Sequence, residues 1–469
     1  MDWLPEGHLV YFLLDVLGEL DLSVIESKIQ ARDPRGARPY SPAMMVGLLI
    51  YAYCLGVRSS RKIERATYED VAFRVLSGGQ QPDHTRISEF RRQHLKAFKA
   101  LFLQVLQLCQ KAGLVKLGHV AIDGTKVQGN ASKHKAMSYR RMDELEKRLQ
   151  AEIEALLEQA EKADTQEDAR FGVGQKEEDL PAELRHREDR LERLRAAKAA
   201  LESEAKQSRA ATLRDQAERA REAAETSEDA RQRKSHQTRA RNLDQKARDL
   251  DDEDPGPSPP GTLPGHRVRT EIDGTPHGKA QRNFTDPDSR IMERGGSFLQ
   301  GYNCQAAVDA AHQIIVAADA SNQSPDNGNL VPMLEQVQSN CGRSAEVATA
   351  DSGYWAPTVP DACRELGTEA YIATERRRHW DRDDTMTEGP CESKDPREAM
   401  HRKLRSAEGR QIYAKRKSIV EPVFGQIKEA RGVRRMMLRG LEAVQGEWQL
   451  ICLSHNLLKI FRNRAVAAA

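Results

Sequence analysis

Three acidic residues, far apart in the chain, stand where α/β proteins place reactive side chains. Asp123 lies in the apolar, β-branched run from Val120 to Val127, which is typical of a strand, and Asp351 directly follows a second such run, 346–350. Glu421 lies in a predicted helix near the C-terminus. Active residues of α/β sheets lie at the carboxyl ends of strands. A helix packed across two neighbouring strands could therefore bring Glu421 beside both aspartates.

Three converging carboxylates repel one another unless cations neutralise them, and a pair of Mg²⁺ ions is the natural occupant of such a site. Two such ions can activate a water molecule or a 3′-hydroxyl and stabilise the leaving oxygen in phosphodiester chemistry. Each residue alone also has an ordinary interpretation. An Asp-Gly pair such as Asp123-Gly124 is more often a turn, and a charged stretch around Glu421 suits a surface helix with salt bridges.

Cations surround the third carboxylate. Arg416, Lys417 and Lys428 share its predicted helix with apolar residues at spacings of three and four. Residues 400–469 contain 15 Lys and Arg against 5 Glu and no Asp. This part of the chain is therefore a candidate surface for a polyanion.

Length and composition restrict the class of protein. A chain of 469 residues has room for two to four domains, and its 31% charged residues require a large solvated fraction. The seven cysteines form no CxxC pair, which argues against a disulfide framework or a zinc module and favours a reducing cytoplasm. The sequence has neither an apolar run of about 18 residues nor the pattern of a signal peptide, so we expect no membrane association.

Residues 1–117 predict a helical domain. Two basic stretches, Arg58 to Arg65 and Thr85 to Arg92, are separated by a Gly- and Pro-containing segment. This arrangement is consistent with a helix-turn-helix-like module, in which Arg91 and Arg92 would contact DNA phosphates. A plain helical domain with a solvated basic face is the alternative.

The remainder of the chain predicts a sheet domain that is interrupted by a long insertion. Residues 118–136 begin this domain, 137–254 form the insertion, 255–283 form a linker, and 284–469 complete the domain with C-terminal helices. Apolar residues spaced by three and four predict that two helices of the insertion, joined around 171–181, form an antiparallel coiled coil. Beyond Ser208 the apolar seam thins to alanine, which predicts that 210–254 is frayed or helical only on a partner. Residues 375–397 predict a loop.

These motifs together resemble the bacterial insertion-sequence transposases of the DDE class. The resemblance rests on Asp123-Gly-Thr-Lys, on Asp351-Ser-Gly-Tyr-Trp and on the segment from Tyr413 to Lys428, which contains Val-Glu421-Pro-Val-Phe-Gly. It implies an α/β fold: an RNase H-like mixed sheet with flanking helices, plus the all-α N-terminal domain and the helical coiled-coil insertion.

The resemblance also implies roles for individual residues. Asp123, Asp351 and Glu421 would be catalytic and bind two Mg²⁺ ions, for which Mn²⁺ can substitute. Tyr413, Lys428 and either Arg416 or Lys417 would hold DNA phosphates, because Arg416 lies one residue further from Glu421 than in the common family form.

The implied activity is cleavage at the ends of the element, followed by joining of the 3′-hydroxyl to target DNA. The partners would be terminal inverted repeats and target DNA, bound by a homodimer in the bacterial cytoplasm near the nucleoid. Two alternatives stay open: an inactive DNA-binding relic, and a related metal-dependent nuclease without strand transfer.

Overall fold

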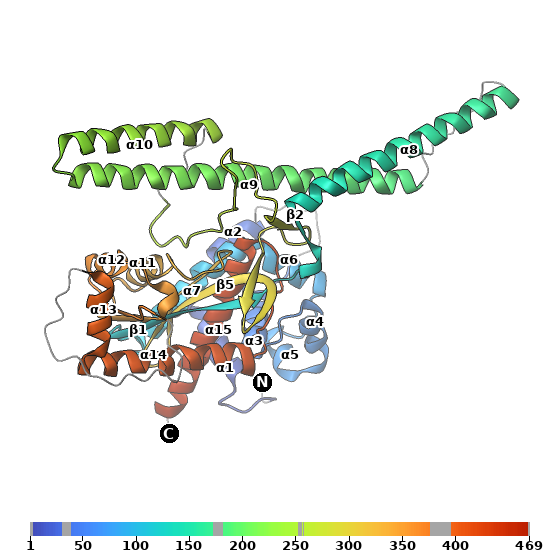
Figure 1. The fold of residues 1–469 in the computed structure, drawn as a ribbon. Helices are drawn as coiled ribbons and strands as arrows, with labels where there is room; N and C mark the ends of the chain where they lie inside the picture. Colours follow the sequence, from blue (N-terminus) through green and yellow to red (C-terminus); the bar gives the residue numbers. More distant parts are fainter. Residues whose placement is uncertain are drawn as a thin grey trace. The chain divides into compact units, whose positions relative to one another are not determined.

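The computed structural model describes residues 3–30, 39–171, 182–251, 256, 258–375 and 395–467. The chain divides into two compact units (Figure 1). Unit 1 comprises Met1–Ala131, Pro259–Gly265 and Asp288–Ala469, and unit 2 comprises Ser132–Ser258 and His266–Pro287. The second unit is thus an insertion into the sequence of the first.

The N-terminal part of unit 1 is entirely helical, as the sequence predicts. Helix α3 is buried nearly all round, and its residues from Met45 to Cys54 form the centre of the helical core. The two predicted basic helices are α4 and α6, and a third short helix, capped by Asp70, lies between them in the chain. The helices are α1 (Leu9–Glu19), α2 (Ser23–Gln30), α3 (Pro42–Cys54), α4 (Ser60–Glu69), α5 (Val71–Leu76), α6 (His84–Gln93) and α7 (Leu95–Lys111).

A mixed six-stranded sheet forms the centre of unit 1. The strand order is β4-β5-β1-β7-β8, and β6 also pairs with β5. Strands β1, β7 and β8 are parallel, whereas β5 is antiparallel to β1, β4 and β6. The strands are β1 (His119–Gln128), β4 (Arg290–Arg294), β5 (Ser297–Asp309), β6 (Ile315–Ser321), β7 (Val347–Ala350) and β8 (Glu369–Ile372).

Helices pack on this sheet and join it to the N-terminal helices. Helix α14 contacts β1, β5, β7 and β8, and α15 contacts β6, α3 and α7, with Trp448 fully buried. The predicted fold class, a mixed α/β sheet with flanking helices and an all-α N-terminal region, is confirmed. The elements are α11 (Leu330–Cys341), η2 (Ser352–Tyr354), α12 (Val359–Glu365), α13 (Pro396–Arg405), α14 (Ala407–Gly425), the π-helix η3 (Gln426–Ala430) and α15 (Leu441–Ala467).

Unit 2 is dominated by the long helix α9, which has a different partner along each part of its length (Figure 1). Its first half packs against α8 through Leu191, Leu194 and Leu201, and its second half packs against α10 through alanines. Ion pairs Lys198–Asp143 and Arg187–Glu152 show that α8 and α9 are antiparallel. The elements are η1 (Lys133–Lys135), β2 (Ala136–Ser138), α8 (Tyr139–Phe171), α9 (Ala182–Thr226), α10 (Ala230–Leu250) and β3 (Gln281–Asn283).

The expectation of a frayed segment after Ser208 is wrong. Helix α9 continues to Thr226 and α10 forms a further helix, because Ala210, Ala217 and Ala240 are buried where the two helices meet. Small side chains allow close packing, so an alanine seam replaces the leucine seam. The predicted connection at 172–181 and most of the predicted loop at 375–397 lie outside the described residues, and α13 begins at Pro396.

Within the described ranges, no helix is both long enough and apolar enough to cross a lipid bilayer.

Candidate functional site

Asp123 and Asp351 lie at the same level of neighbouring parallel strands. Ala121 of β1 pairs with Thr349 of β7, and each aspartate follows two residues later. The Asp351 carboxylate accepts a hydrogen bond from the Gly353 backbone nitrogen at 2.8 Å and so caps the turn η2. The parallel pairing therefore brings together two residues that are 228 positions apart in the sequence.

The Asp123 carboxyl is largely buried, and its charge is only partly compensated. Burial raises its pKa to about 6, the Arg416 guanidinium opposes this shift, and the charge of Asp351 adds to it. Nη1 of Arg416 lies 3.3 Å from Oδ2 of Asp123. Since α14 crosses β1 and β7, a helix residue can reach a strand carboxylate.

A third aspartate, which the sequence analysis missed, lies at the same edge. Asp326 follows β6 and accepts hydrogen bonds from Lys126 at 3.0 Å, Asn303 at 2.7 Å and Gln305 at 2.8 Å. Its charge also contributes to the raised pKa of Asp123. Strand β6 is antiparallel to β5, and β5 is antiparallel to β1, so β6 and β1 end at the same edge of the sheet. The direction of β6 was thus the signal that could have revealed Asp326.

The glycines beside the two predicted aspartates leave room for Asp326. A Cβ atom at Gly124 would lie 2.6 Å from Oδ1 of Asp326, and one at Gly353 would lie 3.6 Å from its Oδ2. Gly124 is therefore a strand residue that allows a close approach rather than part of a turn.

The side chains of α14 and η3 differ in how far they enter the site. Arg416 is only 9% exposed, and its guanidinium lies 5.9 Å from the centre of the Tyr413 ring. Lys428 is partly buried; burial and the nearby Arg294 lower its pKa. Lys417 and Glu421 are exposed. Arg416 and Lys417 were the two candidates for the phosphate contact. Of these, the structure places Arg416 beside Asp123.

The structure does not gather the three predicted carboxylates into a finished metal site. Among the described residues, no group of three or more His, Cys, Asp or Glu side chains is arranged to hold a metal ion. Asp123 and Asp351 nonetheless fit a divalent cation, because they are hard oxygen donors with mutually repelling charges. Glu421 lies one residue after the buried Val420, near the sheet but directed to the outside.

Arg91 is not placed to contact DNA, which corrects the sequence-based expectation. Its side chain is 4% exposed and donates hydrogen bonds to the Tyr53 hydroxyl at 3.1 Å and the Arg58 carbonyl at 2.8 Å. A guanidinium held in this way is part of the core. Arg92, the next residue on α6, is exposed.

Two families of known proteins match parts of the chain. The family described as "Transposase domain (DUF772)" matches residues 1–93, and the family described as "Transposase DDE domain" matches residues 265–457. The chain belongs to the insertion-sequence DDE transposases. No curated protein and no solved structure matched the chain.

The two matches cover the candidate site of this DDE transposase only in part. The DDE match covers Asp326, Asp351 and the whole of α14, whereas neither match covers Asp123 or residues 94–264. The family implies DNA binding, DNA phosphodiester cleavage and transfer, and the use of divalent metal ions. Most of unit 2 therefore lies outside the part that the family models describe.

Proposed function

We propose that this DDE transposase cleaves DNA at the ends of its element and joins the freed 3′-hydroxyl to target DNA. The observation that carries the proposal is the position of Asp123 and Asp351 at one edge of the parallel strands, with Arg416 beside them. This arrangement combines metal-binding oxygens with a buried cation that can bind a phosphate.

Asp123 and Asp351 would hold the divalent cations, two Mg²⁺ ions with Mn²⁺ as a substitute. When bound, such ions supply a nucleophilic water or hydroxyl and stabilise the charge on the leaving oxygen. Burial is the main cause of the raised pKa of Asp123, and the binding of cations would relieve the additional repulsion from Asp351.

The cations of α14 and η3 would hold the DNA backbone. The guanidinium of Arg416 presents a planar set of donors that suits bidentate contact with a phosphate, whereas Lys428 acts as a point charge. Tyr413, which lies against Arg416, would help to orient that guanidinium. Lys417 is an outer contact in this proposal, because its side chain is exposed.

We assign the third ligand to Glu421, with Asp326 as its competitor. Glu421 would have to turn inward from α14, whereas Asp326 is already at the site but is engaged by Lys126 and two amides. A homodimer that binds terminal inverted repeats and target DNA would be the working assembly.

The central test is the variant Asp351→Asn. We expect it to abolish Mg²⁺-dependent nicking of DNA that carries the inverted repeats of the element, while binding to those ends is retained. Asp361→Asn, which removes an exposed carboxylate from α12, is the matched control and should cleave normally. Equal cleavage by both variants would refute the site. Cleavage without joined products would indicate the nuclease, and absence of both in the unaltered chain would indicate the inactive relic.

Cysteine substitution distinguishes the two candidates for the third ligand. A thiol prefers softer metals than Mg²⁺. Glu421→Cys should therefore lose activity in Mg²⁺ and regain it in Mn²⁺ or Cd²⁺, whereas Asp326→Cys should show no such rescue. The opposite pattern would move the third ligand to Asp326.

A further inference from the structure

Helix α10 of unit 2 carries far more positive charge than the helix on which it packs. It contains seven Lys and Arg residues against Asp244 and Asp249, whereas α9 contains 11 basic and 10 acidic residues. The apolar spacing that predicts paired helices does not require this excess of positive charge on α10. The excess charge belongs to one helix.

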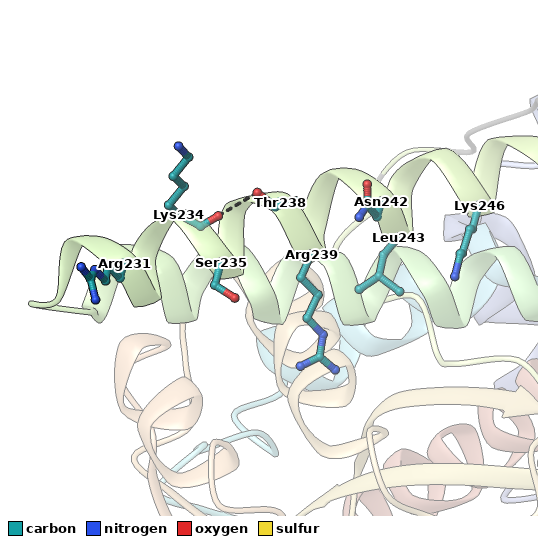
Figure 2. A pocket seen from close by; sticks show the side chains of 8 residues that line it. All are labelled: Arg231, Lys234, Ser235, Thr238, Arg239, Asn242, Leu243 and Lys246. Atoms are coloured by element: carbon teal, nitrogen blue, oxygen red, sulfur yellow. Dashed lines mark hydrogen bonds between the residues drawn. The ribbon is translucent and has the colours of Figure 1, made fainter.

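Eight residues of α10 form a shallow depression, which we name the α10 surface. Four of them are cations, three carry a hydroxyl or an amide, and one is apolar. Figure 2 shows the cations spread along the helix, with Lys234 directed to one side and Arg239 and Lys246 to the other. The residues are Arg231, Lys234, Ser235, Thr238, Arg239, Asn242, Leu243 and Lys246.

The contacts that hold α10 on α9 come from residues other than these four cations. Ala240 and Ala247 pack α10 against α9, Asp229 caps its first turn, and Arg221 pairs with Asp244. Among the described residues, the side chains of the four cations of the α10 surface have no ion pair and no hydrogen bond, and all four are exposed. Since charges without internal partners remain available, this surface is suited to an external anion.

We propose that the α10 surface binds the backbone of duplex DNA without sequence preference. Arginine and lysine, together with hydroxyl and amide groups, are the side chains that contact phosphates and sugars. From Arg231 to Lys246 the helix extends about 22 Å, which matches roughly six or seven base pairs of a duplex. A protein partner is less well matched, because the only apolar residue of the surface is Leu243, which is partly buried, and protein interfaces rely on large apolar anchors.

This inference rests on the proposed function only in that the chain acts on DNA. The site around Asp123 would provide the chemistry, and the α10 surface would hold additional DNA of the element or of the target. Its contribution should be electrostatic, and therefore strongly dependent on salt.

The test compares two double variants of the full-length chain that remove the same charge from the same helix. Arg231→Gln/Arg239→Gln alters the α10 surface. Arg241→Gln/Arg248→Gln alters exposed arginines that do not line the α10 surface and that project about a quarter to half a turn round the helix from Arg231 and Arg239. The probe is a duplex of arbitrary sequence without inverted repeats, and its Kd is measured in EDTA over a series of salt concentrations.

The surface variant should lower the slope of log Kd against log salt concentration by about 2, because about 0.9 counterion is released for each phosphate contact. The control variant should change the slope by less than half as much. Circular dichroism should give both variants the helix content of the unaltered chain. An equal change in both variants, or no change in either, would overturn the proposal.

The measurement is independent of cleavage. If the chain does not nick DNA, the salt slopes still report whether the α10 surface binds DNA. If the slopes do not change, the nicking result still tests the proposed function. Failure of the proposed function and failure of this inference are therefore distinguishable.

Discussion

Two regions of this transposase contain clusters of basic residues, and the two clusters have opposite environments. In unit 1, Arg58 and Arg91 are buried around Tyr53 and Glu447, with Arg58 Nη1 3.5 Å from a Glu447 oxygen. On α10 of unit 2, the cations of the α10 surface are exposed and have no partner among the described residues. A basic stretch in a sequence can thus be part of a core or a binding surface. Partners distant in the sequence decide which it becomes.

The difference has an energetic consequence. Removing one member of a buried charged network leaves other charges unpaired in a medium of low polarity, so folding stability falls. Removing an exposed charge affects stability little but weakens attraction to a polyanion. Each of the following measurements tests one side of this contrast.

The largest effect should come from Glu447→Gln. The Glu447 carboxylate accepts backbone hydrogen bonds from Met437 and Leu438 at 2.8 and 2.9 Å and compensates Arg58. We expect a loss of about 3–5 kcal/mol in the free energy of unfolding, measured by urea denaturation. Glu442→Gln is the control on the same helix, where the carboxylate is 71% exposed, and its change should stay below about 1 kcal/mol. Similar losses of unfolding free energy in both variants would show that the burial of Glu447 does not determine its contribution to stability.

Arg416→Gln should affect catalysis. Because Arg416 lies beside Asp123 and Tyr413, its loss should lower kcat/KM for cleavage of transposon ends by about 10² to 10³, as for removal of a single preorganised charge-stabilising donor. Lys417→Gln is the exposed neighbour and should lower it much less. A larger effect at Lys417 would assign the phosphate contact to that residue.

Asp326→Asn should destabilise the site moderately. The asparagine oxygen can still accept from Asn303 and Gln305, but the side chain loses its negative charge beside Lys126, and its NH2 group replaces the oxygen that accepts from that ammonium at 3.2 Å. The expected cost is about 1–3 kcal/mol in the free energy of unfolding. Asp361→Asn, on the exposed face of α12, should cost far less, and parity between the two would mean that Asp326 is not held as described.

The smallest effect should distinguish two adjacent arginines. Arg92→Gln should lower the salt slope of DNA binding by about 1, which corresponds to one phosphate contact, with unfolding free energy nearly unchanged. Arg91→Gln should leave the slope unchanged and reduce stability, because Arg91 is bonded to Tyr53 and to the Arg58 carbonyl. Reversed outcomes would restore Arg91 as the DNA contact.

Much of the fold could be predicted because its signals are local. The alternation around Val120 and the apolar spacing of α11 specify a strand and a helix within a few residues. The pairing of α9 with α10 could not be predicted in the same way, because a seam of small alanine side chains gives a weak apolar pattern and its burial depends on the partner helix.

The candidate site was predictable in part for a related reason. Asp123 lies within a recognisable strand and Asp351 directly follows another, so both could be assigned to the sheet from local pattern alone. Asp326 follows a strand too, but the edge at which it lies depends on the antiparallel pairing of β6 with β5. Asp326 also lies five residues beyond the end of β6, in a Ser-Pro-Asp-Asn-Gly segment that is typical of a turn, so nothing local marks it as a site residue.

The sequence by itself determined most of the helices and strands, the association of two aspartates with strands, and the grouping of Glu421, Arg416 and Lys428 in one region near the C-terminus. Only the tertiary structure decided that Arg416 contacts Asp123, that Arg91 lies in the core, that Asp326 joins the site and that the cations of α10 stay exposed. The physical reason is that secondary structure follows from side-chain periodicity along the chain, whereas the state of a charge follows from its neighbours in space.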